Sequence, residues 1–356
     1  MNSFFLFFTI FSVVILYGQL SLKIKTRKES DLLENLTVVI PFRNEFHHLR
    51  NLLDFIKNQS KFPAEIIFVN DHSEDESIVV IEQMTNFPVK ISLLSTENEG
   101  KKFALRKGIS QAKTAFILTL DADVELPSDY FQNLATLEIG DAFILPVKIV
   151  ASSPLFNFFK LDYYYLFALN NGIHFLERPF SASGANFLFR KEKYEQFLST
   201  DRNQSVSSGD DQYFVHFLVK NKAEIQLCTD ERFAVKTALP ITFREILQQR
   251  IRWIKKGASV QSFMPVLMGI IGLVYHLGCL ILAFFFPQQI IEILLTKILF
   301  DALVFYPYGN RLGDTPKIKE IIFFSLFYPF WMLFIAVASF VITPKWKGRK
   351  ISIKKS

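Results

Sequence analysis

Two carboxylates separated by one residue, Asp121 and Asp123, follow directly on the apolar run AFILTL at residues 115–120. Carboxylates and a diphosphate both supply the hard oxygen ligands that Mg²⁺ and Mn²⁺ prefer. A cation held there would neutralise the charge that builds on a departing diphosphate. An Asp-rich surface turn is the alternative for an isolated pair of this kind. The pair therefore predicts a metal and diphosphate site if other polar residues converge on it.

A second segment whose side chains could bind a ligand, QRIRW at residues 249–253, lies just before a long uncharged stretch. The guanidinium of Arg252 can bind a phosphate with two parallel hydrogen bonds, and the indole of Trp253 offers a flat surface for a sugar or an acceptor. A basic, aromatic helix that only lies on lipid is the alternative. We expect Gln249, Arg252 and Trp253 to close the site from the membrane edge.

Short apolar runs alternate with amphipathic stretches between residues 36 and 240, which is typical of an α/β sheet. Ligands of open α/β sheets bind beyond the carboxyl ends of the strands. Asn44–Glu45, Asp71 and the Asp121/Asp123 pair all follow such ends, so we expect them to converge on one site. The pattern predicts strands at 36–41, 65–70, 89–94 and 115–120, and helices at 45–59, 75–84 and 103–112.

The composition indicates a membrane protein. Half of the 356 residues are apolar, Phe alone supplies 40 of them, and the mean hydropathy is +0.23. The net charge of +6 is concentrated beside apolar segments, so it is interpreted as membrane-flanking charge and no nucleic-acid partner is expected. Two cysteines are too few for a disulfide framework or a zinc site.

Three long stretches carry no charged side chain, at residues 1–22, 257–291 and 321–344. The first lacks the basic start and small-residue cleavage site of a signal peptide, so an uncleaved anchor is expected. Basic residues at 23–28 follow it and place the next domain in the cytoplasm. Residues 290–306 are apolar except for three charged side chains, of which Lys297 and Asp301 could pair on a helix. Whether this segment spans or lies in the interface is left open.

These boundaries give five regions. The expected order is a transmembrane anchor at 1–22, a cytoplasmic α/β domain at 36–240, an amphipathic interfacial helix at 241–257, a membrane region of two or three spans at 258–344 and a basic tail at 345–356. The protein is accordingly expected in the cell membrane as a multi-pass protein.

Seven segments, taken in order, resemble the membrane-bound family 2 inverting glycosyltransferases, which include cellulose, chitin and hyaluronan synthases and ceramide glucosyltransferases. The resemblance covers residues 36–256, and seven segments in the order of the family carry weight that no single one has. The segments are VVIPFRNE (38–45), FVNDHSEDES (68–77), EGKKFAL (99–105), TLDADVELP (119–127), SGANFLFRK (183–191), SGDD (208–211) and QRIRW (249–253).

The resemblance implies a GT-A (Rossmann-like) nucleotide-sugar domain with flanking transmembrane helices. It places Asp121 near the ribose and the metal, Mg²⁺ or Mn²⁺, and Asp123 on the metal. Asn70-Asp71 stands where the family often has Asp-Asp, which leaves Asp71 as the expected uridine contact. Glu45 would help to orient the nucleoside, although Glu45 and Asp71 could also be plain helix caps.

Three further positions follow from the same resemblance. Lys101, or its neighbour Lys102, would hold a phosphate or the base, and the family position favours Lys101. Gly184, within SGAN, would shape the sugar or acceptor pocket, because Gly and Ala admit close backbone approach. Where the family often has Glu-Asp or Thr-Glu-Asp, this chain has Gly209-Asp210-Asp211.

An inverting transfer needs one base to take the proton of the acceptor hydroxyl as it attacks the anomeric carbon. Asp211 is the best match to that base and Asp210 is the alternative, while an ordinary helix cap is the structural interpretation of the pair. The expected activity is transfer of a hexose from a nucleotide-sugar donor, a UDP-sugar by family habit, to a lipid or membrane-held glycan acceptor. A processive polysaccharide synthase subunit and an inactive scaffold that binds nucleotide are the alternatives.

Overall fold

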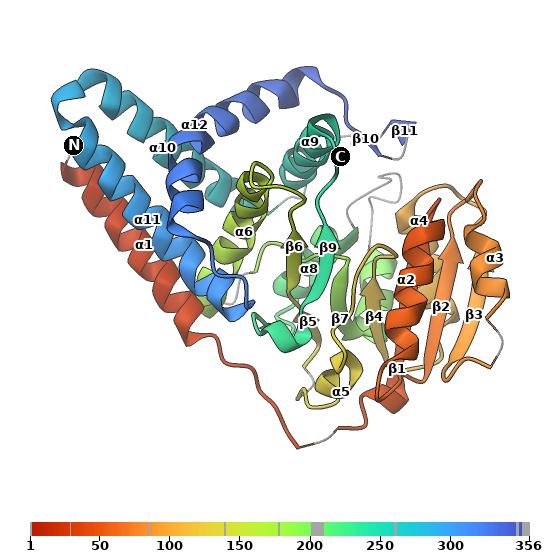
Figure 1. Cartoon of the computed structure of the whole chain (residues 1–356). Coiled ribbons are helices and arrows are strands. Elements are labelled where there is room, and N and C mark those ends of the chain that lie inside the picture. Colours follow the sequence, from red (N-terminus) through yellow and green to blue (C-terminus); the bar gives the residue numbers. More distant parts are fainter. Residues whose placement is uncertain are drawn as a thin grey trace. The chain divides into compact units, whose positions relative to one another are not determined.

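The computed structural model describes residues 2–28, 30–84, 86–138, 140–176, 179–200, 210–259, 262–346 and 349–350. The chain divides into two compact units (Figure 1). The sheet unit comprises Lys23–Lys148 and Ala182–Ala238. The helical unit comprises Met1–Leu22, Ile149–Ser181 and Leu239–Ser356.

A seven-stranded sheet in the order β3-β2-β1-β4-β7-β5-β8 forms the centre of the sheet unit (Figure 1). The first four strands in this order are parallel, and β7 runs antiparallel to both β4 and β5. Strands β1, β2 and β4 are buried along their whole length, as expected where both faces of a parallel sheet are covered. The strands are β1 (Leu36–Phe42), β2 (Glu65–Asn70), β3 (Lys90–Ser95), β4 (Phe116–Leu120), β5 (Ala142–Ile144), β7 (Asn186–Arg190) and β8 (Ile225–Leu227).

The helices of the sheet unit follow the predicted pattern. Helix α2 buries Leu49, Leu52, Leu53 and Ile56, the spacing of one apolar helix face. The four strands and three helices predicted before residue 121 are confirmed, with ends that differ by two residues or fewer. The helices are α2 (Phe46–Lys57), α3 (Ser77–Glu82), α4 (Lys101–Gln111), α5 (Tyr130–Leu134), α7 (Lys191–Thr200) and α8 (Asp210–Lys220), with short 3-10 helices η1 (Leu33–Asn35) and η3 (Glu231–Phe233).

Among its described residues, the helical unit has three helices that are long and apolar enough to cross a membrane, namely Ser3–Ser21, Phe263–Phe285 and Ile318–Val341. They coincide with the three uncharged stretches of the sequence. The helices of this unit are α1 (Asn2–Ser21), α6 (Asn157–Gly172), α9 (Phe243–Ser259), α10 (Phe263–Phe285), α11 (Ile290–Arg311) and α12 (Ile318–Val341), with η2 (His174–Leu176) and η4 (Pro287–Gln289).

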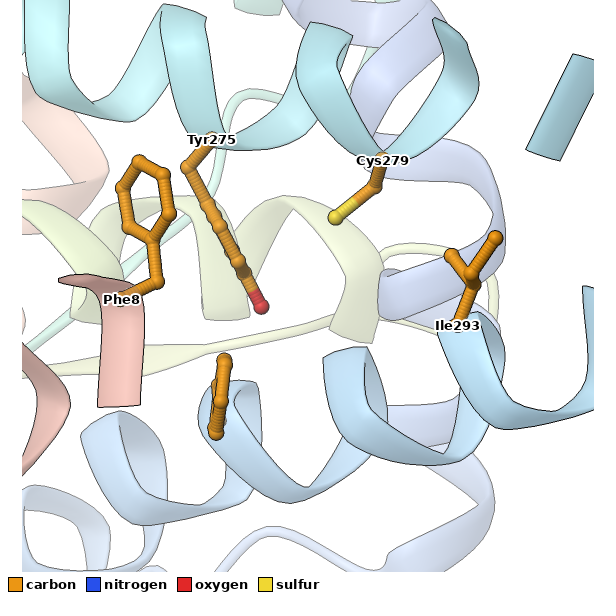
Figure 2. Packing of buried hydrophobic residues seen from close by; sticks show 5 residues of the cluster. Phe8, Tyr275, Cys279 and Ile293 are labelled. Atoms are coloured by element: carbon orange, nitrogen blue, oxygen red, sulfur yellow. The ribbon is translucent and has the colours of Figure 1, made fainter. Parts of the chain in front are cut away.

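An apolar cluster joins α1, α10 and α11. Phe8 and Tyr275 lie ring against ring with centroids 4.9 Å apart, and Cys279 follows one turn farther along α10 (Figure 2). Ile293 and Phe300 of α11 complete the cluster. Large side chains therefore interlock the three helices, and Tyr275 Oη also donates to the carbonyl of Lys297 at 3.3 Å.

Residues 290–306, whose course the sequence left open, belong to the single long helix α11. The expected pairing on this helix is present, because Lys297 Nζ lies 2.7 Å from Asp301 Oδ2 and both side chains are almost fully buried. Ser325 of α12 donates a hydrogen bond of 2.6 Å to the same Asp301 oxygen. Lys297 and Asp301 thus point between helices, where a paired charge is tolerated.

Residues Ile149–Ser181, which the sequence analysis placed inside the α/β domain, pack with the helical unit. Helix α6 is buried on nearly all sides, which is the pattern of a helix surrounded by others. Gly18 of α1 and Gly172 of α6 allow close approach, since a β-carbon on Gly18 would lie 1.7 Å from the carbonyl oxygen of Gly172. Two small sheets, β6 (Val147–Val150) with β9 (Val235–Ala238) and β10 (Lys345–Trp346) with β11 (Arg349–Lys350), complete the fold.

Candidate active site

The carboxyl ends of β1, β2 and β4 deliver polar residues to one edge of the sheet unit. These three strands are parallel neighbours, so Glu45, Asp71 and Asp121 follow at the same edge. The backbone N–H of Asp71 donates to the carbonyl of Phe42 at 2.8 Å, which ties the first two strand ends together. The predicted convergence of these clusters is therefore built by the topology of the sheet.

The loop after β1 is held by the loop after β2. Asn44 adopts a left-handed backbone with φ 52°, and the N–H of Glu45 donates to Ser77 Oγ at 2.8 Å. Asp75 accepts the N–H of Phe46 at 3.1 Å and so caps α2, a role that the side chain of Glu45 does not take. The Glu45 carboxylate instead meets the ring of His48 at 2.6 Å.

An open hollow of about 340 Å³ lies beside this loop, lined by residues 44–48 together with Asp75 and Glu76. Its lining includes the aromatic ring of Phe46 and the carboxylates of Glu45 and Asp75. This arrangement can take a flat polar group such as a nucleobase.

A relay of contacts fixes Lys101. Asp71 is 1% exposed, and its Oδ1 accepts the N–H of Gly100 at 2.8 Å. Gly100 has φ 125°, a conformation that a side chain would strain, and α4 begins at the next residue. Lys101 Nζ then forms an ion pair with Asp121 Oδ1, whereas Lys102 is buried, with 3% of its surface exposed. The structure thus brings Lys101 to the strand ends.

The acidic groups at this edge repel one another. Desolvation by the surrounding protein raises the pKa of Asp123 to about 6, and the negative charges of Asp121 and Glu45 act in the same direction. The charges of Lys101 and His48 oppose the shift. Asp123 nevertheless keeps an exposed surface, so water screens part of the repulsion. A cation bound here would relieve the remaining excess of negative charge.

The donor set fits a divalent cation that brings other ligands with it. Asp121 and Asp123 supply carboxylate oxygens, which Mg²⁺ and Mn²⁺ prefer. Among the residues that the structure describes, no group of three or more His, Cys, Asp or Glu side chains is arranged to hold a metal ion by itself. The cation would therefore need oxygen ligands from a bound diphosphate and from water.

Gly184, which precedes β7, and Asp211 of α8 lie near Lys101. A β-carbon placed on Gly184 would lie 3.8 Å from Asp211 Oδ2 and 3.8 Å from Lys101 Nζ. The missing side chain therefore leaves open space between a carboxylate and an ammonium group. Asp211 is the second residue of α8, and its Oδ1 accepts the N–H of Gln212 at 2.9 Å. The side chain of Asp210 lies outside the described residues.

Two residues near the site were missed by the sequence analysis. His48 was not singled out from the sequence, although it lies on α2 three residues after Glu45, the residue that precedes this helix, and that spacing was a usable signal. Thr237 Oγ1 lies 3.4 Å from Asp123 Oδ2, and no pattern in the sequence connects residues 114 positions apart.

Gln249, Arg252 and Trp253 lie on α9 in the helical unit, and their spacing places them on one face of that helix. Their participation in the site at the sheet edge stays a prediction. The neighbouring Arg250 was not singled out from the sequence, although it is the buried arginine of this helix and pairs with Asp162 at 2.6 Å.

Comparisons with known proteins give these residues a context. Residues 37–198 match the model of glycosyl transferase family 2. An uncharacterised glycosyltransferase of Bacillus subtilis is 22% identical over 303 residues, which cover 80% of this chain and 91% of the relative. The undecaprenyl-phosphate 4-deoxy-4-formamido-L-arabinose transferase of Yersinia enterocolitica is 32% identical over 114 residues, which cover 31% of this chain and 35% of the relative.

A solved structure shares the fold. The mannosyltransferase of Pyrobaculum calidifontis, in complex with GDP-mannose and Mn²⁺, superposes with a TM-score of 0.51 at 18% identity, covering 92% of this chain and 98% of the mannosyltransferase. The family match spans the elements from β1 to α7, which contain Glu45, Asp71, Lys101 and the Asp121/Asp123 pair. Residues 37–198 therefore match a family 2 glycosyltransferase domain, the fold is of the GT-A type, and the chain is a transferase.

Proposed function

We propose that the protein is an integral-membrane inverting glycosyltransferase that moves a hexose from a nucleoside diphosphate sugar, a UDP-sugar, to a lipid or membrane-held glycan. The observation that carries this proposal is the meeting of Lys101, Asp121, Asp123 and Asp211 at one edge of the sheet unit. Asp121 and Asp123 can bind a cation and Lys101 can bind a phosphate. Asp211 can accept a proton.

The donor is bound by the acidic edge. Asp121 and Asp123 would hold Mg²⁺ or Mn²⁺, and the cation would supply positive charge to neutralise the leaving diphosphate. Lys101, kept in place by the contact of Asp71 with Gly100, reaches Asp121 and can turn to a phosphate oxygen when the donor enters. Glu45 lines the hollow beside α2 and orients the nucleoside there. Direct contact between Asp71 and the uridine is a further part of this proposal.

Asp211 acts on the acceptor. Its Oδ2 faces the open space at Gly184, where the sugar would sit. The acceptor oxygen attacks the anomeric carbon while its proton passes to Asp211, and the bond from that carbon to the diphosphate oxygen breaks. One displacement of this kind inverts the anomeric centre. No covalent link between sugar and protein is required.

The membrane assignment rests on three helices of sufficient length and apolarity. The basic residues 23–28 after α1 favour a cytoplasmic sheet unit, where nucleotide sugars are supplied. The name of the Yersinia enterocolitica relative specifies an undecaprenyl-phosphate acceptor, which supports a lipid acceptor here. Gln249, Arg252 and Trp253 would then meet the acceptor or the diphosphate at the membrane edge.

The test is nucleotide release by the detergent-purified full chain, supplied with Mn²⁺ or Mg²⁺, a panel of UDP- and GDP-sugars and a membrane lipid extract. We expect release with one donor and a clear increase on adding lipid. The length of the labelled product separates single transfer from processive synthesis. UDP binding without release from any donor would contradict the transferase proposal and support a scaffold that binds nucleotide. The Asp123→Asn variant controls for contaminating hydrolases.

A further inference from the structure

A buried carboxylate on α6 accepts two hydrogen bonds from one helix and forms an ion pair with another. Asp162 is 5% exposed and accepts hydrogen bonds from Tyr328 Oη at 2.8 Å and Trp331 Nε1 at 3.1 Å, both on α12. Its Oδ2 also pairs with Arg250 Nε of α9 at 2.6 Å. All three helices belong to the helical unit. A carboxylate with two hydrogen-bond donors and a paired guanidinium is held in one orientation, since each contact restricts its rotation.

The partner of Asp162 in turn holds an aromatic ring of the QRIRW segment. The guanidinium of Arg250 is buried, and it stacks 4.4 Å from the centre of the Trp253 ring. Tyr163, the neighbour of Asp162 on α6, meets the same indole with ring centroids 5.5 Å apart. The position of Trp253 is therefore set by two consecutive residues of α6, one acting directly and one through Arg250.

We propose that Asp162 is a positioning residue, which orients Arg250 and, through it, the Trp253 ring that receives the sugar or the acceptor. The inference rests on the proposed function, because that function gives Trp253 its role. An unpaired Arg250 would be a buried charge, and it would leave its place over the indole to find water or another acceptor. Trp253 would then lose one of the two contacts that fix its ring.

Helix α6 also has a comparable set of contacts with Asp314, and these contacts do not involve α9. Asp314, between α11 and α12, accepts from Tyr164 Oη at 2.6 Å and from Lys160 Nζ at 3.1 Å. This pair also ties α6 to its neighbours with an acidic side chain and an aromatic hydroxyl. The Asp314→Asn variant is therefore a control for general loosening of α6.

A double-mutant cycle tests the relay, that is, the contacts that run from Asp162 through Arg250 to Trp253. Asp162→Asn and Trp253→Ala should each lower the turnover rate about tenfold or more, and the double variant should be no slower than Trp253→Ala alone, because both changes remove one function. Asp314→Asn should have a smaller effect, and that effect should multiply with the effect of Trp253→Ala. If the losses from Asp162→Asn and Trp253→Ala multiply, the relay is contradicted.

A second variant guards against loss of folding. Removing one partner of a buried ion pair destabilises a protein, whereas replacing both with neutral residues is often tolerated. The combined Asp162→Asn and Arg250→Met variant should therefore fold with a melting temperature near that of the original chain and still turn over slowly. Recovery of full turnover in this variant would show that Asp162 serves only to balance the charge of Arg250.

A readout that needs no turnover separates this inference from the proposed function. The chain has three tryptophans, so fluorotryptophan labelling gives three ¹⁹F signals, which single Trp→Phe variants assign. Asp162→Asn should shift and broaden the Trp253 signal, and Asp314→Asn should leave it unchanged. An unmoved Trp253 signal overturns the relay whether or not the protein transfers sugar. A moved signal with no nucleotide release from any donor would instead retain the relay and reject the proposed function.

Discussion

The two units of the molecule arrange their charged side chains in opposite ways. At the edge of the sheet unit, Glu45, Asp121 and Asp123 are close enough to raise one another's energy, with Lys101 as the nearby fixed cation. In the helical unit, each of three acidic residues has its own basic partner. These pairs are Arg250 with Asp162, Lys160 with Asp314, and Lys297 with Asp301.

The difference separates a site that requires a ligand from contacts that are complete in themselves. A paired charge between helices gains nothing from an added ion, because its partner already supplies the opposite charge. An excess of carboxylates at a strand edge is relieved only when a cation arrives from solution. Changes at the sheet edge should therefore act on turnover and ligand binding, and changes at the Lys160–Asp314 and Lys297–Asp301 pairs should act first on stability.

The largest effect is expected for Asp211→Asn, since an amide cannot take the proton of the acceptor hydroxyl. We expect turnover to fall by about 10²- to 10⁴-fold. UDP titrated by calorimetry should bind as tightly as before, because Asp211 lies at the Gly184 space and not at the nucleoside hollow. If UDP binding is lost instead, Asp211 holds the donor and is not the base.

The matched control for this variant is Asp210→Asn, one residue earlier on α8. Because Asp210 is the alternative base, the two variants decide between them. Turnover that survives in Asp210→Asn and collapses in Asp211→Asn supports the proposed assignment, and the reverse result exchanges the two roles.

Asp123→Asn should come next, with a loss of about 10²- to 10³-fold in metal-dependent turnover, because one carboxylate ligand of the cation is removed. The concentration of Mn²⁺ needed for half-maximal rate should rise as well. The control is Asp129→Asn, an exposed acidic residue six positions later. Full activity of Asp123→Asn at low Mn²⁺ would remove the metal assignment.

Asp301→Asn tests the opposite side of the comparison. Lys297 would be left as a buried charge, and this should lower stability by about 3–5 kcal/mol, measured by thermal or denaturant unfolding in detergent. The paired change of Lys297→Met with Asp301→Leu should restore most of that loss. Folded Asp301→Asn protein should keep the metal dependence of the original chain. Selective loss of Mn²⁺ response would show that the helical pairs also serve the site.

How far the sequence predicted the structure depends on the range of the interactions. Strands such as 36–41 and the helix at 45–59 were predicted because their apolar periodicity is local. The convergence of Asp71 with Asp121 followed from strand order, but the connection of Asp71 to Lys101 through Gly100 did not, since it depends on a backbone of φ 125°.

The contacts of α6 show where prediction from sequence stops. Its residues Lys160 and Asp162 gave no periodic or motif signal, and their partners lie 88 or more positions away, at Asp314 and Arg250. Residues 149–181 were assigned to the α/β domain for the same reason. Helix α6 is buried on nearly all sides, so it has no polar face that indicates which unit it packs with.

The smallest effect is expected in the stability of the metal-free protein. The pKa of Asp123 is raised from its ordinary value of 3.8 to about 6, with desolvation as the first cause and the charge of Asp121 as the next. The folded protein therefore holds this proton to higher pH than the unfolded chain does. The resulting contribution to stability is complete below pH 3.8 and is lost as the pH rises through about 6.

Asp123→Asn has no such proton to lose. In EDTA, the melting temperature of the original chain should therefore fall relative to that of Asp123→Asn between about pH 4 and about pH 7. Adding Mn²⁺ at the higher pH should stabilise the original chain and leave the variant unchanged, because the cation replaces the repulsion between Asp121 and Asp123 with attraction. Parallel melting curves at every pH would mean that solvent already screens these carboxylates, and that their closeness does not by itself demand a cation.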